Sequence, residues 1–285
     1  MTISIDLAPN LIFRFWKFLR QNPLTSTFKK LKIELLIVKQ KYILMCWSGE
    51  ASGVLATIGI STALYIAKKG ESRELWIPLL YFALMELLQA VTYIYIGQCD
   101  NIINKALTSL GYIHIMFQPF FVNMTAMYFI PTSIKHKISP YVYSFCGIAV
   151  IAFAVKWTPF SWTSLCFVGR ETFCGPYACS MRGSWHIAWQ LPLNNILSVP
   201  LISHYFYGLH AYTYLLTGFI MPLIYGSWRF ILLTFLLGPF ISTLSTNNIN
   251  EFPAIWCLFS IALCLTTIKS PLRQYLHVQA FFFYP

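Results

Sequence analysis

Residues 75–97 read LWIPLLYFALMELLQAVTYIYIG, an apolar stretch long enough to cross a bilayer. A membrane-spanning helix needs about 20 such residues. Within this stretch Glu86, Gln89 and Tyr93 follow an i, i+3, i+7 spacing, which places them on one stripe of a helix. Insertion scales penalise a charged side chain in hydrocarbon by about 2.5–3.5 kcal/mol, so such residues usually face the protein interior. The stretch therefore predicts a membrane span whose polar stripe is turned towards other helices.

The composition of the whole chain agrees with a membrane protein. Of its 285 residues, 57% are hydrophobic and only 10% are charged, whereas a soluble domain carries about 25% charged residues. Seven spans are predicted in total: 44–67, 75–97, 106–130, 138–155, 201–225, 227–246 and 250–268. The predicted fold is all-α, a polytopic transmembrane bundle of about seven helices over 44–268, followed by a C-terminal tail over 269–285.

The segment before the first span, residues 1–43, is basic and amphipathic. Its cationic residues alternate with apolar ones, as in NLIFRFWKFLR at 10–20. Beside a membrane span this pattern is typical of an interfacial helix that binds anionic headgroups. The chain has a net charge of +11. We predict that its basic segment binds membrane lipids and that nucleic acid is not a partner.

Basic residues in the predicted loops indicate an orientation. One side of the bundle carries Lys68, Lys69, Arg73, Lys135, Lys137, Arg229, Lys269 and Arg273, and the other carries Lys105, Lys156, Arg170 and Arg182. The positive-inside rule then predicts a cytoplasmic C-terminus and an outside N-terminus. The basic N-terminal segment argues the other way, although long tails can cross regardless of charge.

Four cysteines fall in loops on the side predicted to be outer: Cys99, Cys166, Cys174 and Cys179. Oxidising compartments favour disulfides, and four cysteines allow three pairings. We predict that disulfides between them staple the outer loops.

The longest connection, residues 156–200, contains SWHIAWQLP at 184–192. Tryptophan prefers the boundary between membrane and water, and long connections are often lids. The segment predicts a short helix that lies across the mouth of a pocket, with His186 near that mouth. An aromatic anchor with an incidental histidine is the alternative.

Polar side chains from several spans are predicted to lie near one membrane face. In an antiparallel bundle, the starts of odd-numbered spans share a face with the ends of even-numbered spans. The residues concerned are Glu50, Glu86, Gln89, Asp100, His114, Gln118, His186, His204, His210, Asn247 and Glu251. Asn123 falls on the opposite side of its helix and is predicted to make a separate hydrogen bond between helices.

Carboxylates and imidazoles at matched depth suit Zn²⁺ or another divalent ion, and they equally suit a proton relay. In the first hypothesis, the chain is a metal-dependent lipid hydrolase or acyl transferase, in which the metal lowers the pKa of a water. Its metal ligands are His114, His210 and Glu251, and Glu50 or Glu86 is the catalytic base. Its pocket is lined by Gln89, Asp100, Gln118, His186, His204 and Asn247.

Two other classes of function fit the same residues. In a proton- or ion-coupled transporter, Glu50, Glu86 and Glu251 would carry protons or cations. Transporters usually have internal repeats and broken helices, and no repeat is visible in this sequence. In a receptor-like or structural membrane protein, the same groups would form an internal polar network without catalysis.

Three stretches carry a resemblance: MCWSGEAS at 45–52, YIHIMFQPFFVN at 112–123 and NEFPAIWCLFSIAL at 250–263. They resemble a family of multi-pass membrane proteins of unknown function, over about residues 45–268. The resemblance implies a fold and no activity, and it implies that Glu50, Glu86, His114 and Glu251 are recurrent residues.

The chain is more loosely similar to the alkaline-ceramidase and progestin-receptor superfamily of seven-helix zinc hydrolases. That similarity implies zinc held by histidines and an aspartate, for which His114 and Asp100 are available. The late pair here is His204-x5-His210 instead of His-x3-His, which puts the two rings about 120° apart on a straight helix. A shared metal would require a bend there.

Overall fold

The computed structural model describes residues 48–199 and 208–278. The predicted interfacial segment 1–43, residues 279–285 of the predicted tail and His204 lie outside these residues.

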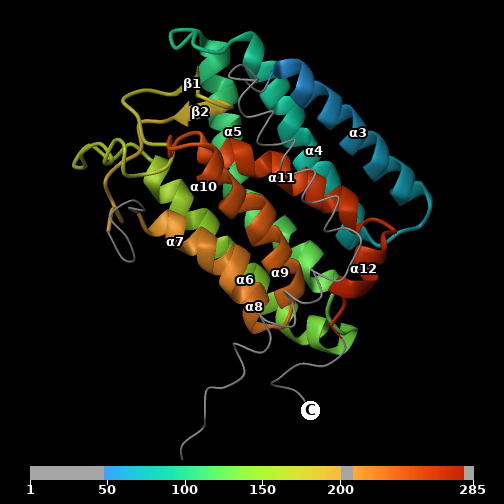
Figure 1. Cartoon of the computed structure of the whole chain (residues 1–285). Helices are drawn as coiled ribbons and strands as arrows, with labels where there is room; N and C mark the ends of the chain where they lie inside the picture. The colour runs from blue at the N-terminus through green and yellow to red at the C-terminus, as the bar shows by residue number, and fades with distance from the viewer. Residues whose placement is uncertain (1–47, 200–207, 279–285) are drawn as a thin grey trace, which may run out of the picture. The chain divides into compact units, whose positions relative to one another are not determined.

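Four long helices form the first half of the described chain (Figure 1). Their bounds are α3 (Gly49–Lys68), α4 (Arg73–Ile94), α5 (Ile102–Tyr128) and α6 (Thr132–Trp157). Side chains cap three of them, because Ser48, Ser72 and Asn101 each accept a hydrogen bond from a backbone N–H of the first turn. These caps satisfy donors that have no partner within a helix, and they fix where each helix begins.

Two of the later helices change their winding halfway. The first runs from α7 (Leu209–Leu215) through the π-helical η1 (Leu216–Ile220) into α8 (Met221–Ile224). The second runs from α9 (Trp228–Phe235) through the π-helical η2 (Leu236–Phe240) into α10 (Ile241–Ser245). The last helices are α11 (Phe252–Thr267) and α12 (Pro271–Leu276).

A proline lies in or close to each of the two π segments, whereas Pro78, Pro119 and Pro140 lie inside α4, α5 and α6 without a π segment. Pro222 lies two residues after the end of η1, and Pro239 lies within η2. Proline has no N–H to donate four residues back, and its ring crowds the preceding turn. A wider π turn relieves both problems, and π turns are frequent at functional sites.

The count of spans needs a correction. Among the described residues, a helix follows each of the seven predicted stretches, but only four are long and apolar enough to cross a membrane: Gly49–Lys68, Arg73–Ile94, Thr132–Trp157 and Trp228–Ser245. Leu209–Ile224 and Phe252–Thr267 are apolar but shorter. The remaining helix, α5, has 27 residues, and its hydropathy is reduced by side chains that are buried within the protein, among them Asn104, Gln118 and Asn123.

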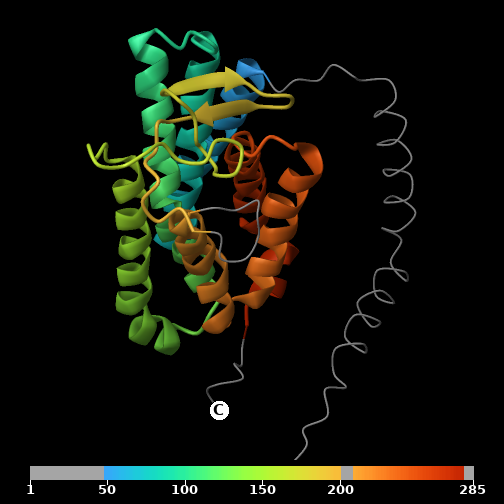
Figure 2. The ribbon, with the colours of Figure 1, turned by 90° about the vertical axis from the view of Figure 1, so that its left-hand side faces the viewer.

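The connection between α6 and α7 forms a cap over one end of the helices; we call residues 158–199 the cap. It contains strands β1 (Cys179–Arg182) and β2 (Ile187–Gln190), which pair antiparallel with Cys179 opposite Gln190. Figure 2 shows this hairpin beside the upper part of α5 and above the upper ends of the orange and red helices. The predicted helix in SWHIAWQLP is therefore wrong, because this segment forms the hairpin turn and β2. Gly183 and Ser184 turn the chain here, and Ile187, Ala188 and Trp189 bury their side chains as strand residues.

Two disulfides hold the cap. Cys99, in the turn between α4 and α5, is bonded to Cys179 of β1, and Cys166 is bonded to Cys174 within the cap. These are the four loop cysteines that the sequence singled out, in one of the three pairings that it left open.

Small residues allow α3 and α4 to pack closely. A Cβ atom added to Gly59 would lie 2.7 Å from the Cβ atom of Ala83, and one added to Gly49 would lie 2.8 Å from that of Tyr93. Figure 1 shows α3, α4 and α11 side by side, and α4 contacts both of the others.

Candidate functional site

Three helices meet in a hydrogen-bonded chain of buried side chains, which we call the central network. The Tyr214 hydroxyl of α7 donates to Gln118 Oε1 of α5 over 2.7 Å. Gln118 Nε2 in turn lies 2.9 Å from the Sγ atom of Cys257, on α11. All three side chains are buried, so this chain couples the positions of three helices through polar contacts.

Glu86 borders the central network from α4. Its side chain is fully buried, and Ser52 of α3 interacts with its carboxyl. The helix that carries it, α4, packs against α11, the helix of Cys257. No ion pair with Glu86 is present among residues 48–199 and 208–278.

Gln89, one turn further along α4, is also fully buried. Its amide has no hydrogen-bond partner among the described residues. The polar stripe of α4 is therefore buried, as predicted, and it carries a carboxyl and an amide that the surrounding protein leaves almost unsatisfied. A buried polar group without partners costs free energy, so such groups need a functional or solvent explanation.

His114 lies beside Tyr81 of α4. The two rings stack with centroids 3.8 Å apart, and the Tyr81 hydroxyl donates a hydrogen bond to the His114 backbone carbonyl. The other face of Tyr81 stacks on Phe121, at 3.6 Å. The imidazole of His114 is thus packed as an aromatic ring between α4 and α5.

Asn123 links α5 to the π segment η1. Its Nδ2 atom donates to the carbonyl of Thr217 over 2.8 Å, and its Oδ1 atom accepts from the Tyr225 hydroxyl over 2.9 Å. The predicted hydrogen bond between helices is confirmed. It also gives a partner to a backbone carbonyl in the widened turn, where regular helical bonding is interrupted.

Trp256 packs against both π segments. Its ring lies 5.2 Å from Phe219 of η1 and 5.0 Å from Tyr214 of α7, measured between centroids. On the other side its indole edge fills the space beside Gly238 of η2, where any side chain would collide with it. Because Trp256 also contacts Tyr214, it links both π segments to the central network.

Glu251 anchors the cap to α11. Its carboxylate accepts backbone hydrogen bonds from Ser184, Trp185 and His186 in the hairpin turn, and a hydroxyl hydrogen bond from Thr246 over 2.7 Å. Its side chain is fully buried. The carboxylate is fully engaged in holding the turn, so Glu251 is a structural residue here and not a free ligand.

His186 lies in the same turn, buried to 2% exposure. Its Nδ1 atom accepts the Ile187 N–H over 2.8 Å and contacts the Tyr93 hydroxyl at 3.2 Å. Burial lowers the pKa of this imidazole to about 3. The ring is therefore neutral at physiological pH, and the proton lies on Nε2 because Nδ1 is an acceptor.

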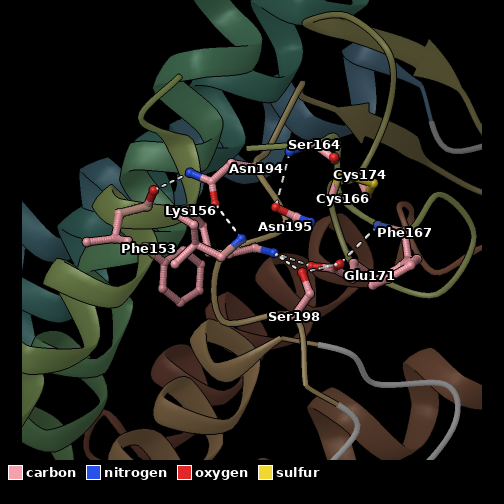
Figure 3. Close-up of polar contacts among 12 residues, drawn as sticks. Phe153, Lys156, Ser164, Cys166, Phe167, Glu171, Cys174, Asn194, Asn195 and Ser198 are labelled. Carbon is pink, nitrogen blue, oxygen red and sulfur yellow. Dashed lines mark hydrogen bonds and ion pairs between the residues drawn. A yellow bond between two sulfur atoms is a disulfide. The ribbon is translucent and has the colours of Figure 1, made fainter. Parts of the chain in front are cut away.

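A charged cluster that the sequence did not predict lies under the cap (Figure 3). Lys156, at the end of α6, donates to Glu171 Oε2 over 2.5 Å and to Ser198 Oγ over 2.7 Å. Ser198 donates to the other carboxylate oxygen over 2.7 Å. Both charged side chains are fully buried. A lysine just beyond an apolar stretch, with a glutamate inside a short Cys-to-Cys loop, was the available clue.

His210 lies close to this cluster, at the start of α7. Its ring packs edge-on against Phe153, with centroids 5.1 Å apart, and it is fully buried. Neither ring nitrogen has a hydrogen-bond partner within the described part of the chain.

The predicted metal site is not formed. Among the described residues, no three His, Cys, Asp or Glu side chains lie close enough to share an ion. His114 is stacked on Tyr81, His210 lies against Phe153, and Glu251 holds the hairpin turn. His210 and Glu251 lie at the starts of their helices, whereas His114 lies at the middle of α5, so the three side chains have separate environments.

Several other predicted site residues stay apart from the central network. Glu50, Asp100 and Asn247 are exposed at the capped end. Gln118 is a central member, and His186 belongs to the cap. The residues of the predicted pocket therefore fall into three groups. Glu86 and Gln118 belong to a buried network, Glu251 anchors the cap, and the remaining group is exposed.

The chain belongs to the family of unknown function DUF5765, whose model matches residues 50–277. The match covers the membrane-like helices and the cap, and it leaves the basic N-terminal segment outside, as the resemblance predicted. No curated protein and no solved structure matches the chain. The looser similarity to the alkaline-ceramidase and progestin-receptor superfamily therefore stays a prediction.

Proposed function

We propose that the chain is an integral membrane protein of seven helices that takes up and releases a proton at Glu86, coupled to a rearrangement of its two π-containing helices. This is the behaviour of a proton-coupled transporter. The observation that carries the proposal is the full burial of the Glu86 carboxyl without a cationic partner among the described residues.

The physical argument starts from the cost of a buried charge. An ion moved from water into a protein interior loses several kcal/mol of solvation unless a partner compensates. Ser52 offers Glu86 a single hydroxyl, and the amide of Gln89 is nearby on the same helix face. Such a site favours the neutral acid at rest, and it holds a carboxylate only when the surroundings change.

The surroundings of Glu86 are built to change. α4, which carries Glu86, packs against α11, and Trp256 of α11 packs on both π segments. Transporters commonly place their sites at interrupted helices, and π turns are weak points in helical winding. A shift of η1 or η2 would move Trp256, and with it the polar groups next to the carboxyl.

The membrane location is supported by the exposed faces of the helices. Tyr141, Phe145, Ile148 and Ile151 form an apolar stripe along α6 with 46–69% exposure. α5 also fits a span, because its exposed residues include Ile102, Leu110 and Phe117, whereas five of its polar side chains are buried: Asn104, Thr108, Gln118, Asn123 and Thr125.

The charges at the two ends support the predicted orientation. The uncapped end carries Lys68, Lys69, Arg73, Lys135, Lys137, Arg229, Lys269 and Arg273 with the acids Glu71 and Glu74. The capped end carries Lys105, Lys156, Arg170 and Arg182 with the acids Glu50, Asp100, Glu171 and Glu251. A basic end faces the cytoplasm, and disulfides form in oxidising compartments. The cap therefore faces outward and the C-terminus inward.

Infrared spectroscopy of the reconstituted protein tests the proposal. A pH titration of the wild type is expected to give the carbonyl band of a buried carboxylic acid, and Glu86→Gln is expected to lose it. Glu74→Gln is the matched control, because Glu74 lies on the same helix with its carboxylate 2.7 Å from Lys135 at the protein surface. A band that survives in Glu86→Gln would refute the assignment of the proton to Glu86.

A further inference from the structure

A hollow in the protein surface lies at the capped end of α3 and α4. Its lining includes Ser48 and Glu50 from the start of α3, Tyr93 from the end of α4, and Arg182 of β1. About 450 Å³ of the hollow is open to the centres of water molecules, whereas one water needs about 10–15 Å³ by this measure. Solvent therefore reaches the ends of both helices.

Polar side chains lead from this hollow into the interface between α3 and α4. On α4, Tyr93, Gln89 and Glu86 follow one another at intervals of four and three residues, which places successive Cβ atoms on one face about 5–6 Å apart. Glu86 is thus about 10 Å from Tyr93 along the helix axis. On α3, Ser52 lies one turn beyond Ser48 and interacts with the Glu86 carboxyl. Two lines of polar side chains therefore meet at Glu86, and we call them together the α3–α4 seam.

The two helices lie side by side along this seam (Figure 1). A Cβ atom added to Gly49 would lie 2.8 Å from that of Tyr93, and one added to Gly53 would lie 3.9 Å from that of Ala90. Ser52 shares this face of α3, because it follows Gly49 by three residues. The seam is therefore part of the contact between the helices and is not exposed to lipid.

The seam ends at Glu86. From there to the uncapped end, the buried residues of α4 are all apolar: Leu75, Pro78, Leu79, Phe82, Ala83 and Met85. The buried residues of α3 beyond Ser52 are also apolar: Ala56, Gly59, Ala63 and Ile66. Apolar side chains offer no hydrogen bond to a proton or to water. Along these two helices, polar groups thus connect the carboxyl to the capped side, and apolar packing separates it from the other side.

Gln89 occupies the middle of the seam. Its side chain has no exposed surface, and neither its Oε1 nor its Nε2 atom has a hydrogen-bond partner among residues 48–199 and 208–278. An amide left in this state costs free energy, which water entering from the hollow would recover. The central network differs in this respect, because the side chains of Tyr214, Gln118 and Cys257 bond to one another. Gln89 is therefore the group with free capacity between the hollow and Glu86.

We propose that the α3–α4 seam is the route by which protons pass between the capped side of the protein and Glu86. The inference rests on the proposed function, to which it adds the side from which the proton comes. Gln89 is a positioning residue, because it holds the water that carries the proton and does not itself change its charge. Tyr93 lies at the entrance, where its hydroxyl contacts His186 Nδ1 of the cap at 3.2 Å. With the cap facing outward, Glu86 exchanges protons with the outside in this arrangement of the helices.

Exchange of the Glu86 proton for deuterium tests the proposal. After the protein in detergent is transferred to D₂O, time-resolved infrared spectroscopy follows the shift of the Glu86 band. Gln89→Leu is expected to slow this shift at least about 10-fold, since one hydrogen bond to the moving proton is lost, and Gln89→Asn, which keeps an amide, is expected to slow it less. Gln98→Leu, at an exposed glutamine outside the hollow, is the matched control and should exchange as the wild type does. Equal rates in Gln89→Leu and the wild type would overturn the proposal.

A charged thiol reagent tests the side of the route and serves as the second measurement if Gln89→Leu fails to fold. Glu50 is exposed in the hollow, and Lys69 is exposed at the opposite end of α3. Reagent bound to Glu50→Cys is expected to slow the exchange at least about 10-fold relative to the same variant before treatment. Reagent bound to Lys69→Cys should have no effect, and treated wild type accounts for the native thiols. Slowing at Lys69→Cys, or none at Glu50→Cys, would contradict the route.

The two proposals fail in different ways. If the carboxylic acid band persists in Glu86→Gln, the proposed function and the route both fall. If the band is lost in Glu86→Gln but its exchange in Gln89→Leu matches the wild type, the proposed function stands and the route is wrong.

Discussion

The buried ion pair between Lys156 and Glu171 offers a quantitative test of how the cap is held. Glu171 lies in the eight-residue loop closed by Cys166 and Cys174, and it accepts the Phe167 N–H over 3.0 Å in addition to its bonds from Lys156 and Ser198. Replacing Glu171 with Gln keeps the size of the side chain but removes its charge. The ammonium group of Lys156 is then left buried without compensation.

The expected cost follows from that geometry. Both side chains have no exposed surface, and breaking a fully buried pair by removing one partner costs about 3–5 kcal/mol. For a protein of this size each kcal/mol lowers the melting temperature by about 2–4 °C. Glu171→Gln is therefore expected to lower it by about 6–20 °C. Lys156→Met should cost less in combination with Glu171→Gln than alone, because the double variant leaves no unpaired charge.

A thiol-reactive fluorescent dye can follow this unfolding, because Cys146, Cys257 and Cys264 are free and buried. The double-mutant cycle should give a coupling of at least about 2 kcal/mol. The same cycle at Lys135 and Glu74, a pair whose side chains are about one-fifth exposed, should give less than about 1 kcal/mol. Equal coupling in the two cycles would refute the claim that burial makes the Lys156–Glu171 pair special.

Three further predictions concern the cap. Replacing Cys99 and Cys179 with Ser opens a loop of 80 residues and should cost about 4.5 kcal/mol in the chain-entropy estimate, against about 2.5 kcal/mol for the pair that closes eight residues; differential scanning fluorimetry would reveal the order, and a reversed order would contradict it. Glu251→Ala removes the acceptor of three N–H groups in the hairpin turn, so limited trypsin digestion should cut faster after Arg182, whereas an unchanged rate would exclude the anchoring role. Burial lowers the pKa of His186 from 6.5 to about 3, so the unfolded chain binds a proton at this residue before the folded one does; the contribution of His186 to stability should fall by about 1.4 kcal/mol per pH unit as the pH drops from 6.5 towards 3, and in pH-dependent thermal melts the slope of His186→Gln should be smaller than that of the wild type by this amount.

The helices could be predicted because each of them contains a long run of consecutive, mostly apolar residues. Each predicted span lies within a few residues of a helix, and the stripe of Glu86 and Gln89 on α4 is buried as its spacing indicated. The ability of each helix to cross a membrane was harder to predict. The polar side chains of α5 reduce its hydropathy. The sequence predicted an inward position for Gln118 and Asn123, whereas the burial of Asn104 is known only from the three-dimensional packing.

The pairings between segments could not be predicted, because they depend on side chains far apart in the chain. Depth along a helix placed His114, His210 and Glu251 near one end, and the metal hypothesis assumed that equal depth meant contact. Each of these side chains instead contacts a different partner. His114 stacks on a tyrosine ring, His210 packs against a phenylalanine ring, and Glu251 accepts hydrogen bonds from the hairpin turn. The cap supplied that turn, and its strands were not expected in a segment rich in tryptophan.

The two buried acids that differ most in their surroundings indicate how the protein divides its tasks. Glu171 is surrounded by Lys156, Ser198 and the Phe167 N–H, and a carboxylate with that many donors is stable as an ion and rigid. Glu86 has one hydroxyl and lies next to the helix that packs on both π segments. A charge that is fully compensated holds a structure in one state, whereas a charge that is poorly compensated makes the state depend on the proton. The rigid acid lies under the cap and the responsive one lies among the helices, so proton binding would act on the helices while the cap stays in place.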